Sequence, residues 1–217
     1  QKFVMKFIQL SYNMNENTPS YGGRHKVSIK PFEKIKNGNT ANSYKVHFYN
    51  HIGTHIDCPN HFFNSGKKIT DYSINDLLFN NPQIIDVDLS KKNEISSKTI
   101  LSEINKNADI ILFRTFFSKY RHSKKYINDY PVFTSEFVCF LIKECVNLRT
   151  IGFDIISLTS PINKDEGKKA HQLLLGNEKP ILIIEDMNLE NYTNNIKNIL
   201  VSPFNFEKID SAPCNVY

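Results

Sequence analysis

One stretch of the chain reads His51-Ile52-Gly53-Thr54-His55-Ile56-Asp57-Cys58-Pro59-Asn60-His61. It contains three of the seven histidines of the sequence and one aspartate. Imidazole and carboxylate groups are common ligands of zinc and similar divalent ions. The four side chains stand at odd-numbered positions, and alternate residues of an extended chain point to the same side. A lone histidine in a strand is usually structural, but this combination indicates a metal site.

The spacing of the possible ligands restricts the local structure. Four residues of strand span about 13 Å, which is too far for His51 and His55 to share one ion. His55 and Asp57 are about 7 Å apart in a strand and can converge on one ion. The chain must therefore turn between residues 51 and 55, and Gly53 tolerates such a turn. A helix is disfavoured by Gly53 and Pro59. We expect a strand ending near His51 and then a tight irregular loop carrying the ligands.

The same stretch resembles the signature of the cyclase family of metal-dependent hydrolases, which includes bacterial kynurenine formamidases and isatin hydrolases. The family pattern is His-x-Gly-Thr-His-x-Asp-x-Pro-x-His, usually followed by Phe or Tyr. Residues 51–62 fit every fixed position of this pattern. The similarity extends to residues 10–216, through an Arg-Thr pair at 114–115, an Asp-x-x-Ser element at 154–157 and an Asp-Ser-Ala-Pro run at 210–213.

Two further segments carry residues that match functional positions of the family. Pro19-Ser20-Tyr21-Gly22-Gly23 is similar to a Pro-x-aromatic-Pro-Gly element whose aromatic residue lines the substrate pocket. The alternative for Tyr21 is that it only covers the loop. Gly22 replaces the second proline, which predicts a more flexible loop. His171, a Gly turn, an apolar strand and Glu185 follow in the family's order, although the loop at 178–180 is about two residues longer than usual.

The resemblance implies a set of site residues and a cofactor. The first metal would be held by His51, His55 and Asp57, and a second by Asp57, His171 and Glu185, with His61 as the general acid/base. The ion would be Zn²⁺ or Mn²⁺, one or two per subunit, since a mixed set of histidines and carboxylates suits both. Two more polar side chains each have two possible roles. Arg114 is expected either to bind a substrate carboxylate or to make a structural ion pair. Asp154 is expected either to support a metal ligand or to close a strand-end turn.

The elements expected from hydrophobic patterns and caps favour a mixed α/β fold. The expected strands cover residues 3–10, 27–32, 44–49, 84–89, 108–115, 150–156, 180–184, 199–206 and 209–216. Helices are expected at residues 74–79, from Ser96 or Ser97 to 104, from Thr134 or Ser135 to 146, and up to Gly176. Without a linker or an internal repeat, residues 1–217 are expected to form a single domain. The family's fold is a swivelling β/β/α arrangement of mixed sheets with flanking helices, often dimeric.

Composition narrows the class of protein. Hydrophobic residues make up 40% and charged residues 23% of the chain, which fits a globular protein. No apolar run is as long as a membrane span, and the N-terminal residues lack a signal-peptide pattern, so a cytoplasmic protein is expected. The four cysteines show no pairing motif and are expected to be reduced thiols. The basic run at residues 119–126 is expected to be a solvated loop, and neither nucleic acid nor membrane is expected as a partner.

The function implied by the resemblance is metal-dependent hydrolysis of a small aryl or cyclic amide. The best-known substrate of the family is N-formylkynurenine, which is hydrolysed to kynurenine and formate in tryptophan catabolism (arylformamidase activity). A metal-activated water would attack the carbonyl carbon, with His61 as general acid/base. The alternatives are opening of isatin or a lactone, or a cyclase or dehydratase reaction at the same site. A non-catalytic metal-binding scaffold predicts the loss of His61 or of a ligand, and none is lost. The expected partners are a small-molecule substrate and further copies of the chain.

Overall fold

An eight-stranded mixed sheet forms the centre of the computed structural model, which describes residues 6–90, 93–96, 100–190 and 196–217. The strand order is β4-β11-β12-β3-β10-β9-β7-β5. The bounds are β3 (His55–Asp57), β4 (Leu78–Phe79), β5 (Pro82–Asp86), β7 (Ile110–Arg114), β9 (Thr150–Phe153), β10 (Leu182–Glu185), β11 (Ile199–Pro203) and β12 (Ser211–Val216). Strands β5, β7, β9 and β10 run parallel, whereas β3 is antiparallel to both β10 and β12. The short strand β3 therefore lies where the parallel and antiparallel halves meet.

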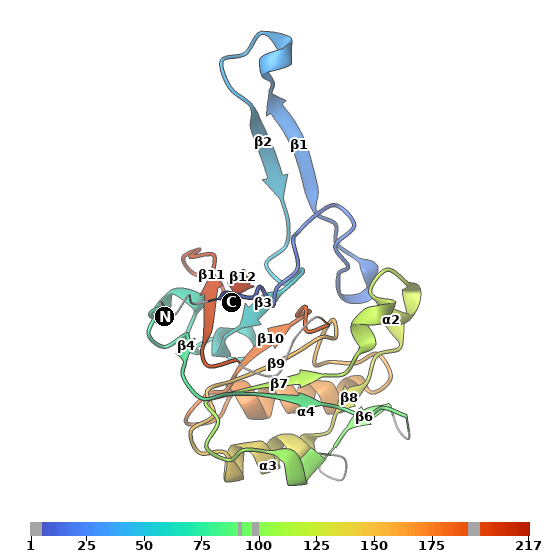
Figure 1. The fold of residues 1–217 in the computed structure, drawn as a ribbon, viewed down its shortest axis with the longest axis vertical. Helices are drawn as coiled ribbons and strands as arrows, with labels where there is room; N and C mark the ends of the chain where they lie inside the picture. The colour runs from blue at the N-terminus through green and yellow to red at the C-terminus, as the bar shows by residue number, and fades with distance from the viewer. Residues whose placement is uncertain (1–5, 91–92, 97–99, 191–195) are drawn as a thin grey trace.

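Two helices lie against the parallel half of the sheet, α3 (Ser135–Glu144) and α4 (Lys164–Leu175) (Figure 1). Each begins at a side-chain cap: Thr134 accepts a hydrogen bond from Phe137 N, and Asn163 accepts one from Glu166 N. The other helical segments with bounds inside the described ranges are short. They are η1 (Tyr21–Gly23), η2 (Ile35–Asn37), η3 (Pro59–His61), η4 (Ile69–Asp71), η5 (Leu101–Glu103), η6 (Phe117–Tyr120) and α2 (Lys124–Asn128).

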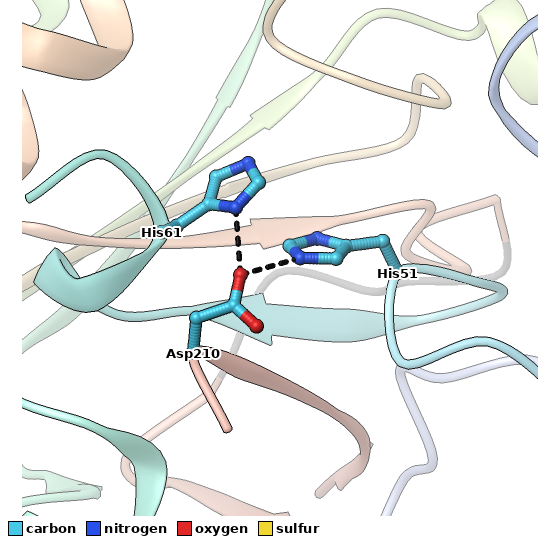
Figure 2. A group of neighbouring side chains, drawn as sticks. All are labelled: His51, His61 and Asp210. Carbon is cyan, nitrogen blue, oxygen red and sulfur yellow. Dashed lines mark hydrogen bonds and ion pairs between the residues drawn. The ribbon is translucent and has the colours of Figure 1, made fainter. Parts of the chain in front are cut away.

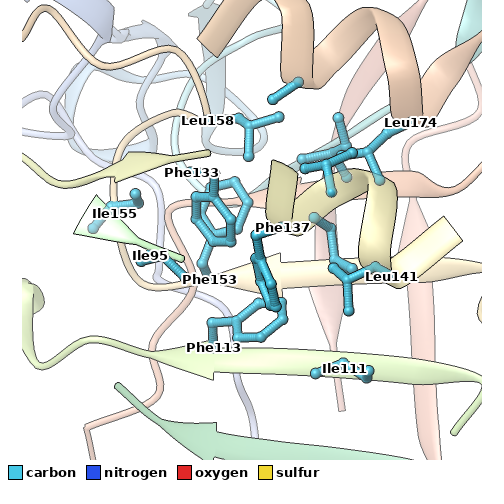
Figure 3. Packing of buried hydrophobic residues seen from close by; sticks show 14 of the residues in the cluster. Ile95, Ile111, Phe113, Phe133, Phe137, Leu141, Phe153, Ile155, Leu158 and Leu174 are labelled. Carbon is cyan, nitrogen blue, oxygen red and sulfur yellow. The ribbon is translucent and has the colours of Figure 1, made fainter. Parts of the chain in front are cut away.

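An aromatic cluster packs the two helices onto the sheet (Figure 3). The ring centroids of Phe113 and Phe137 are 5.6 Å apart, and those of Phe133 and Phe153 are 4.9 Å apart. All four side chains are fully buried. Burial of one phenylalanine side chain contributes about 1.5–3 kcal/mol. The same core holds α4 against α3 and β8, and through α4 it fixes the position of His171.

A hairpin made of β1 (Ser28–Glu33) and β2 (Ser43–His47) projects away from the sheet (Figure 1). It carries large apolar side chains that are more than half exposed, among them Phe32, Tyr44 and Val46. A small parallel pair, β6 (Glu94–Ile95) with β8 (Val132–Phe133), forms a sheet of its own. No helix in the described ranges is both long and apolar enough to cross a lipid bilayer.

The mixed α/β prediction is confirmed, and most expected strands are present with bounds that differ by a few residues, but three predicted elements differ more strongly. Residues 6–10 of the expected first strand are not a strand, although Leu10 N donates to Val216 O; residues 3–5 lie outside the described part. The helix expected at 74–79 is a turn followed by β4, because Phe79 is buried and its strand pairs with β11. Of the helix expected up to residue 104, η5 is a single turn, and residues 97–99 lie outside the described part.

Candidate metal centre

Strand β3 places His55 and Asp57 on one face of the sheet, with Ile56 buried on the other. In the antiparallel pairing with β10, Glu185 stands directly opposite His55. On the other side of β3, Ser211 stands opposite Asp57. The expectation of an irregular loop is therefore wrong for residues 55–57, because both edges of this segment are hydrogen-bonded within the sheet.

The turn expected before these residues is present. Strand β2 ends at His47, and Gly53 has a φ of +64°, a conformation that glycine adopts without strain. The turn brings the ring of His51 back over β3, so that its Nδ1 lies 3.0 Å from Asp57 Oδ1. The turn at Gly53 thus places His51, and strand β3 places His55 and Asp57, so that the three side chains lie close together.

Helix α4 brings His171 to the same place from the C-terminal part of the chain. His171 Nε2 lies 3.5 Å from Glu185 Oε1 and 3.9 Å from Asp57 Oδ2. The potential ligand atoms of Asp57, His171 and Glu185 all lie within 4.8 Å of one another, and the same holds for His51, His55 and Asp57. The structure therefore brings all five predicted ligands into one cluster in which Asp57 is shared.

The hydrogen bonds around this cluster leave lone pairs directed into it. The Nδ1–H of His55 donates to Gly53 O at 2.8 Å, and that of His171 donates to Gly167 O at 3.0 Å. Each Nε2 is then an acceptor. His55 Nε2 lies 3.4 Å from Glu185 Oε2 and 3.6 Å from Asp57 Oδ1. Within the described part of the chain, His55 Nε2 and Asp57 Oδ1 are buried without a hydrogen bond.

Unsatisfied acceptors that face each other in a buried site are unfavourable unless a cation lies between them. Donor atoms bound at about 2.0–2.1 Å to one ion are about 2.8–3.0 Å apart when they are neighbours in an octahedral site and about 3.3–3.4 Å apart in a tetrahedral site. The separations around Asp57 and Glu185, from 3.0 to 3.9 Å, fall within these ranges or are slightly wider. The donor set and its spacing therefore fit a divalent metal ion.

The electrostatics of the cluster also favour a cation. Burial raises the pKa of the Asp57 and Glu185 carboxyls, but the surrounding imidazoles outweigh burial and hold both pKa values below their usual range. Burial lowers the pKa of His51, yet the charge of Asp57 and a hydrogen bond to Asp210 outweigh it and raise the pKa to about 10. The buried carboxylates thus remain ionised and attract positive charge. A divalent metal ion carries two positive charges, whereas a protonated imidazole carries one.

His61 lies at the end of η3, directly after β3. Its ring centroid is 4.1 Å from that of His51 and 6.0 Å from that of His171. Its Nδ1 bonds Asp210 Oδ2 at 2.7 Å. The imidazole therefore stands beside the ligand cluster, where it can exchange a proton with a bound molecule.

A cavity of about 350 Å³ opens onto the cluster. Tyr21 and Phe62 contribute aromatic surface to its wall, and Arg24 and His25 contribute polar groups. Tyr21 belongs to η1, where Gly22 has a φ of +62° that a proline could not adopt. The predicted substrate-binding position of Tyr21 thus faces the same cavity as the predicted ligands.

The contacts of Arg114 and Asp154 are those of structural residues. Arg114 makes two hydrogen bonds to the Asp86 carboxylate, at 2.7 and 2.8 Å, so it ties the ends of β5 and β7 together. Asp154 accepts hydrogen bonds from the backbone and the hydroxyl of Thr115. Burial raises the pKa of Asp154 to about 6. These contacts connect strand ends and do not involve a predicted metal ligand.

Sequence reasoning missed a buried ion pair beside Glu185. Asp186 has a φ of +51°, and its carboxylate accepts hydrogen bonds from Arg121 Nε at 3.0 Å, Arg121 Nη2 at 2.6 Å and the Tyr126 hydroxyl at 2.6 Å. Arg121 and Tyr126 belong to the basic run expected to be a solvated loop, and that expectation is wrong for both, since both are buried. The charge pattern gave no indication of a partner 65 residues away.

The Arg121→Ala variant should be strongly destabilised, because it leaves the Asp186 carboxylate buried without its cation. Removing one partner of a buried pair costs about 3–5 kcal/mol. Chemical denaturation would measure this change in the free energy of unfolding. The double variant Arg121→Ala/Asp186→Asn should lose less, since no buried charge remains. An Arg121→Ala variant within about 0.5 kcal/mol of the wild type, the usual range for neutral surface changes, would contradict a structural role for the pair.

Comparison with known proteins agrees with this geometry. The family model described as "Putative cyclase" matches residues 8–159, which is more than half of the chain. The kynurenine formamidase of Bacillus cytotoxicus is 27% identical over 208 residues, covering 96% of this chain and 94% of that protein. Cyclase-like protein 3 of Oryza sativa subsp. japonica is 25% identical over 218 residues, covering 96% of this chain and 77% of that protein.

Solved structures share the fold at lower sequence identity. An isatin hydrolase bound to the product analogue thioisatinate has a TM-score of 0.76 at 17% identity, covering 97% of this chain and 91% of that chain. A predicted metal-dependent hydrolase from Bacillus stearothermophilus has a TM-score of 0.76 at 19% identity, covering 96% of this chain and 95% of that chain. With the sequence match over residues 8–159 and the fold in agreement, the chain belongs to the cyclase family.

Proposed function

We propose that this protein is a metal-dependent hydrolase of a small aryl or cyclic amide, and that N-formylkynurenine is its substrate. The observation that carries the proposal is the pair of buried, unsatisfied acceptors, His55 Nε2 and Asp57 Oδ1, at the base of a cavity with aromatic walls. The relatives named kynurenine formamidases support the choice of substrate, since they align over 96% of this chain at 24–27% identity.

Amides are hydrolysed slowly in neutral water because a strong nucleophile is missing. Hydroxide is scarce at neutral pH, and a bound divalent ion would lower the pKa of water and polarise the carbonyl group. His51, His55, Asp57, His171 and Glu185 would hold Zn²⁺ or Mn²⁺, and the sharing of Asp57 between the two groups of ligands favours two ions per subunit.

His61 would move the proton in this reaction. Water adds to the carbonyl carbon, His61 Nε2 takes the proton that is released, and the imidazole then delivers it to the leaving nitrogen as the carbon–nitrogen bond breaks. The products are the amine and the carboxylic acid, which are kynurenine and formate for this substrate. Tyr21 and Phe62 would hold the aryl ring between aromatic surfaces.

A substrate screen tests the proposed function. Protein stripped with a chelator and reloaded with Zn²⁺ or Mn²⁺ would be assayed on N-formylkynurenine, isatin and simple lactones. Metal-dependent release of formate from N-formylkynurenine is the expected result. Turnover of isatin or a lactone alone would overturn the substrate but keep the hydrolase. A metal-loaded protein that hydrolyses no amide and no lactone would overturn both.

We also propose that the protein forms a homodimer through the β1–β2 hairpin. A two-stranded hairpin that stands alone is marginally stable in water, and this one exposes Phe32 at 64% and Tyr44 at 57%. A second copy of the chain would cover this apolar surface. Sedimentation should give a dimer for the wild type and a monomer for the Phe32→Ser/Tyr44→Ser variant. A monomeric wild type at micromolar concentration would contradict the proposal.

A further inference from the structure

A carboxylate that sequence reasoning did not assign, Asp210, lies between two of the histidines (Figure 2). Its Oδ2 accepts hydrogen bonds from His61 Nδ1 at 2.7 Å and from His51 Nε2 at 2.8 Å. Its other oxygen, Oδ1, accepts one from Asn50 Nδ2 at 2.8 Å. One side chain therefore touches both the predicted proton-transfer residue and a predicted metal ligand.

The backbone around Asp210 is fixed by the sheet. Asp210 immediately precedes β12, its carbonyl oxygen accepts a hydrogen bond from Cys58 N, and the next residue pairs with Asp57. The carboxylate is thus anchored to the residues that follow the ligand strand. Its position relative to His61 is set by strand pairing and not by a free loop.

The contacts of Asp210 decide which ring nitrogens carry protons. An ionised carboxylate only accepts hydrogen bonds, so both imidazole nitrogens that face it must be protonated. His61 then has its hydrogen on Nδ1 and a lone pair on Nε2, the arrangement that a general base needs. His51 has a hydrogen on Nε2, toward Asp210, and its Nδ1, which lies 3.0 Å from Asp57 Oδ1, would lose its proton when a metal ion binds there.

His51, His61 and Asp210 are also close enough together to be considered as a metal site. Hydrogen bonding explains these contacts better than a shared ion does. Neighbouring ligand atoms on one ion are about 2.8–3.4 Å apart, and Asp210 Oδ2 lies at or below the short end of that range, 2.7 and 2.8 Å from the two ring nitrogens. Such separations are those of direct hydrogen bonds.

We propose that Asp210 is a positioning residue that sets the tautomer and ring orientation of both His61 and His51 through one carboxylate oxygen. The part that concerns proton transfer rests on the proposed function, whereas the tautomers themselves do not. Without this carboxylate, the ring of His61 is free to place its hydrogen on Nε2, and it then cannot act as the base.

The tautomers can be read directly by long-range ¹H–¹⁵N correlation of ¹⁵N-histidine-labelled, Zn²⁺-loaded protein at a pH where His61 is neutral. The wild type should show His61 protonated on Nδ1 and His51 on Nε2. In Asp210→Ala, His61 should shift toward the Nε2–H form. Asp71→Asn is the matched control: it removes a carboxylate from η4, a turn hydrogen-bonded to residue 209, without touching a histidine.

Kinetics and metal titration complete the test. Asp210→Ala should lower kcat about 10²–10⁴-fold, the range for a lost general base, with little change in KM. It should still bind the wild-type number of ions at saturating metal, with affinity weakened no more than about 10–100-fold. Asp210→Asn keeps the shape of the side chain and serves as the second variant if Asp210→Ala folds poorly. Its kcat should lie between those of the wild type and Asp210→Ala.

Three results would overturn the inference. The first is that His61 retains the Nδ1–H form in Asp210→Ala. The second is that Asp210→Asn fails to bind metal at saturation, which would mark Asp210 as a ligand. The third is that Asp71→Asn shifts the tautomer of His61 and lowers kcat as Asp210→Ala does. Failure of the hydrolase proposal is a different result, because the tautomer of His61 is measured without any substrate.

Discussion

The His61→Ala variant is expected to bind metal as the wild type does and to lose about 10²–10⁴-fold in kcat. The imidazole stands beside the ligand cluster, and its Nδ1 is engaged by Asp210, so Nε2 is the atom available for proton transfer. Alanine removes this group without removing any of the five predicted ligands, which come from β3, its preceding turn, α4 and β10. The loss should therefore appear in the chemical step.

Metal content and kcat would be measured together, on the substrate that the screen identifies. His122→Ala is the matched control, since His122 is exposed and lies outside the cavity, and it should behave as the wild type. Full metal occupancy with unchanged kcat would remove His61 from the reaction. Loss of metal would make His61 a ligand.

The Asp57→Ala variant is expected to lose metal binding altogether, and with it all metal-dependent turnover. Asp57 is the one residue common to both groups of potential ligands, and it is almost fully buried between them. Loss of an outer hydrogen bond weakens metal binding about 10–100-fold, so loss of this shared ligand should exceed that range for both ions.

Elemental analysis and titration with Zn²⁺ or Mn²⁺ would measure the effect of Asp57→Ala. The Asp71→Ala variant removes an exposed carboxylate from the nearby turn η4 and should keep the wild-type stoichiometry. A retained equivalent of tightly bound metal in Asp57→Ala would show that the ion lies elsewhere.

Local sequence patterns predicted the parts of the site that depend on local geometry. Alternation at 55 and 57 placed these side chains on one face of the chain, and Gly53 marked the turn. The C-terminal ligands were different: His171 and Glu185 were identified only by resemblance. What brings Glu185 to His55 is the antiparallel register of β10 against β3, and no local pattern specifies that register.

The contacts that sequence reasoning missed are all of long range. Asp210 meets His51 across 159 residues and Arg121 meets Asp186 across 65. Both carboxylates come just outside a strand end, where side chains from other segments converge. The helix wrongly expected at 74–79 has the same cause: its local pattern suits a helix, but Phe79 is buried through the tertiary pairing of β4 with β11.

An anomalous-difference map from crystals grown with Mn²⁺ would test most directly whether this cluster is a metal centre. A peak should appear about 2.0–2.2 Å from His55 Nε2 and from an oxygen of Asp57, and a second peak should be shared by Asp57, His171 and Glu185. A map with no peak among these side chains, while they keep the positions described above, would contradict the metal assignment and the hydrolase mechanism built on it.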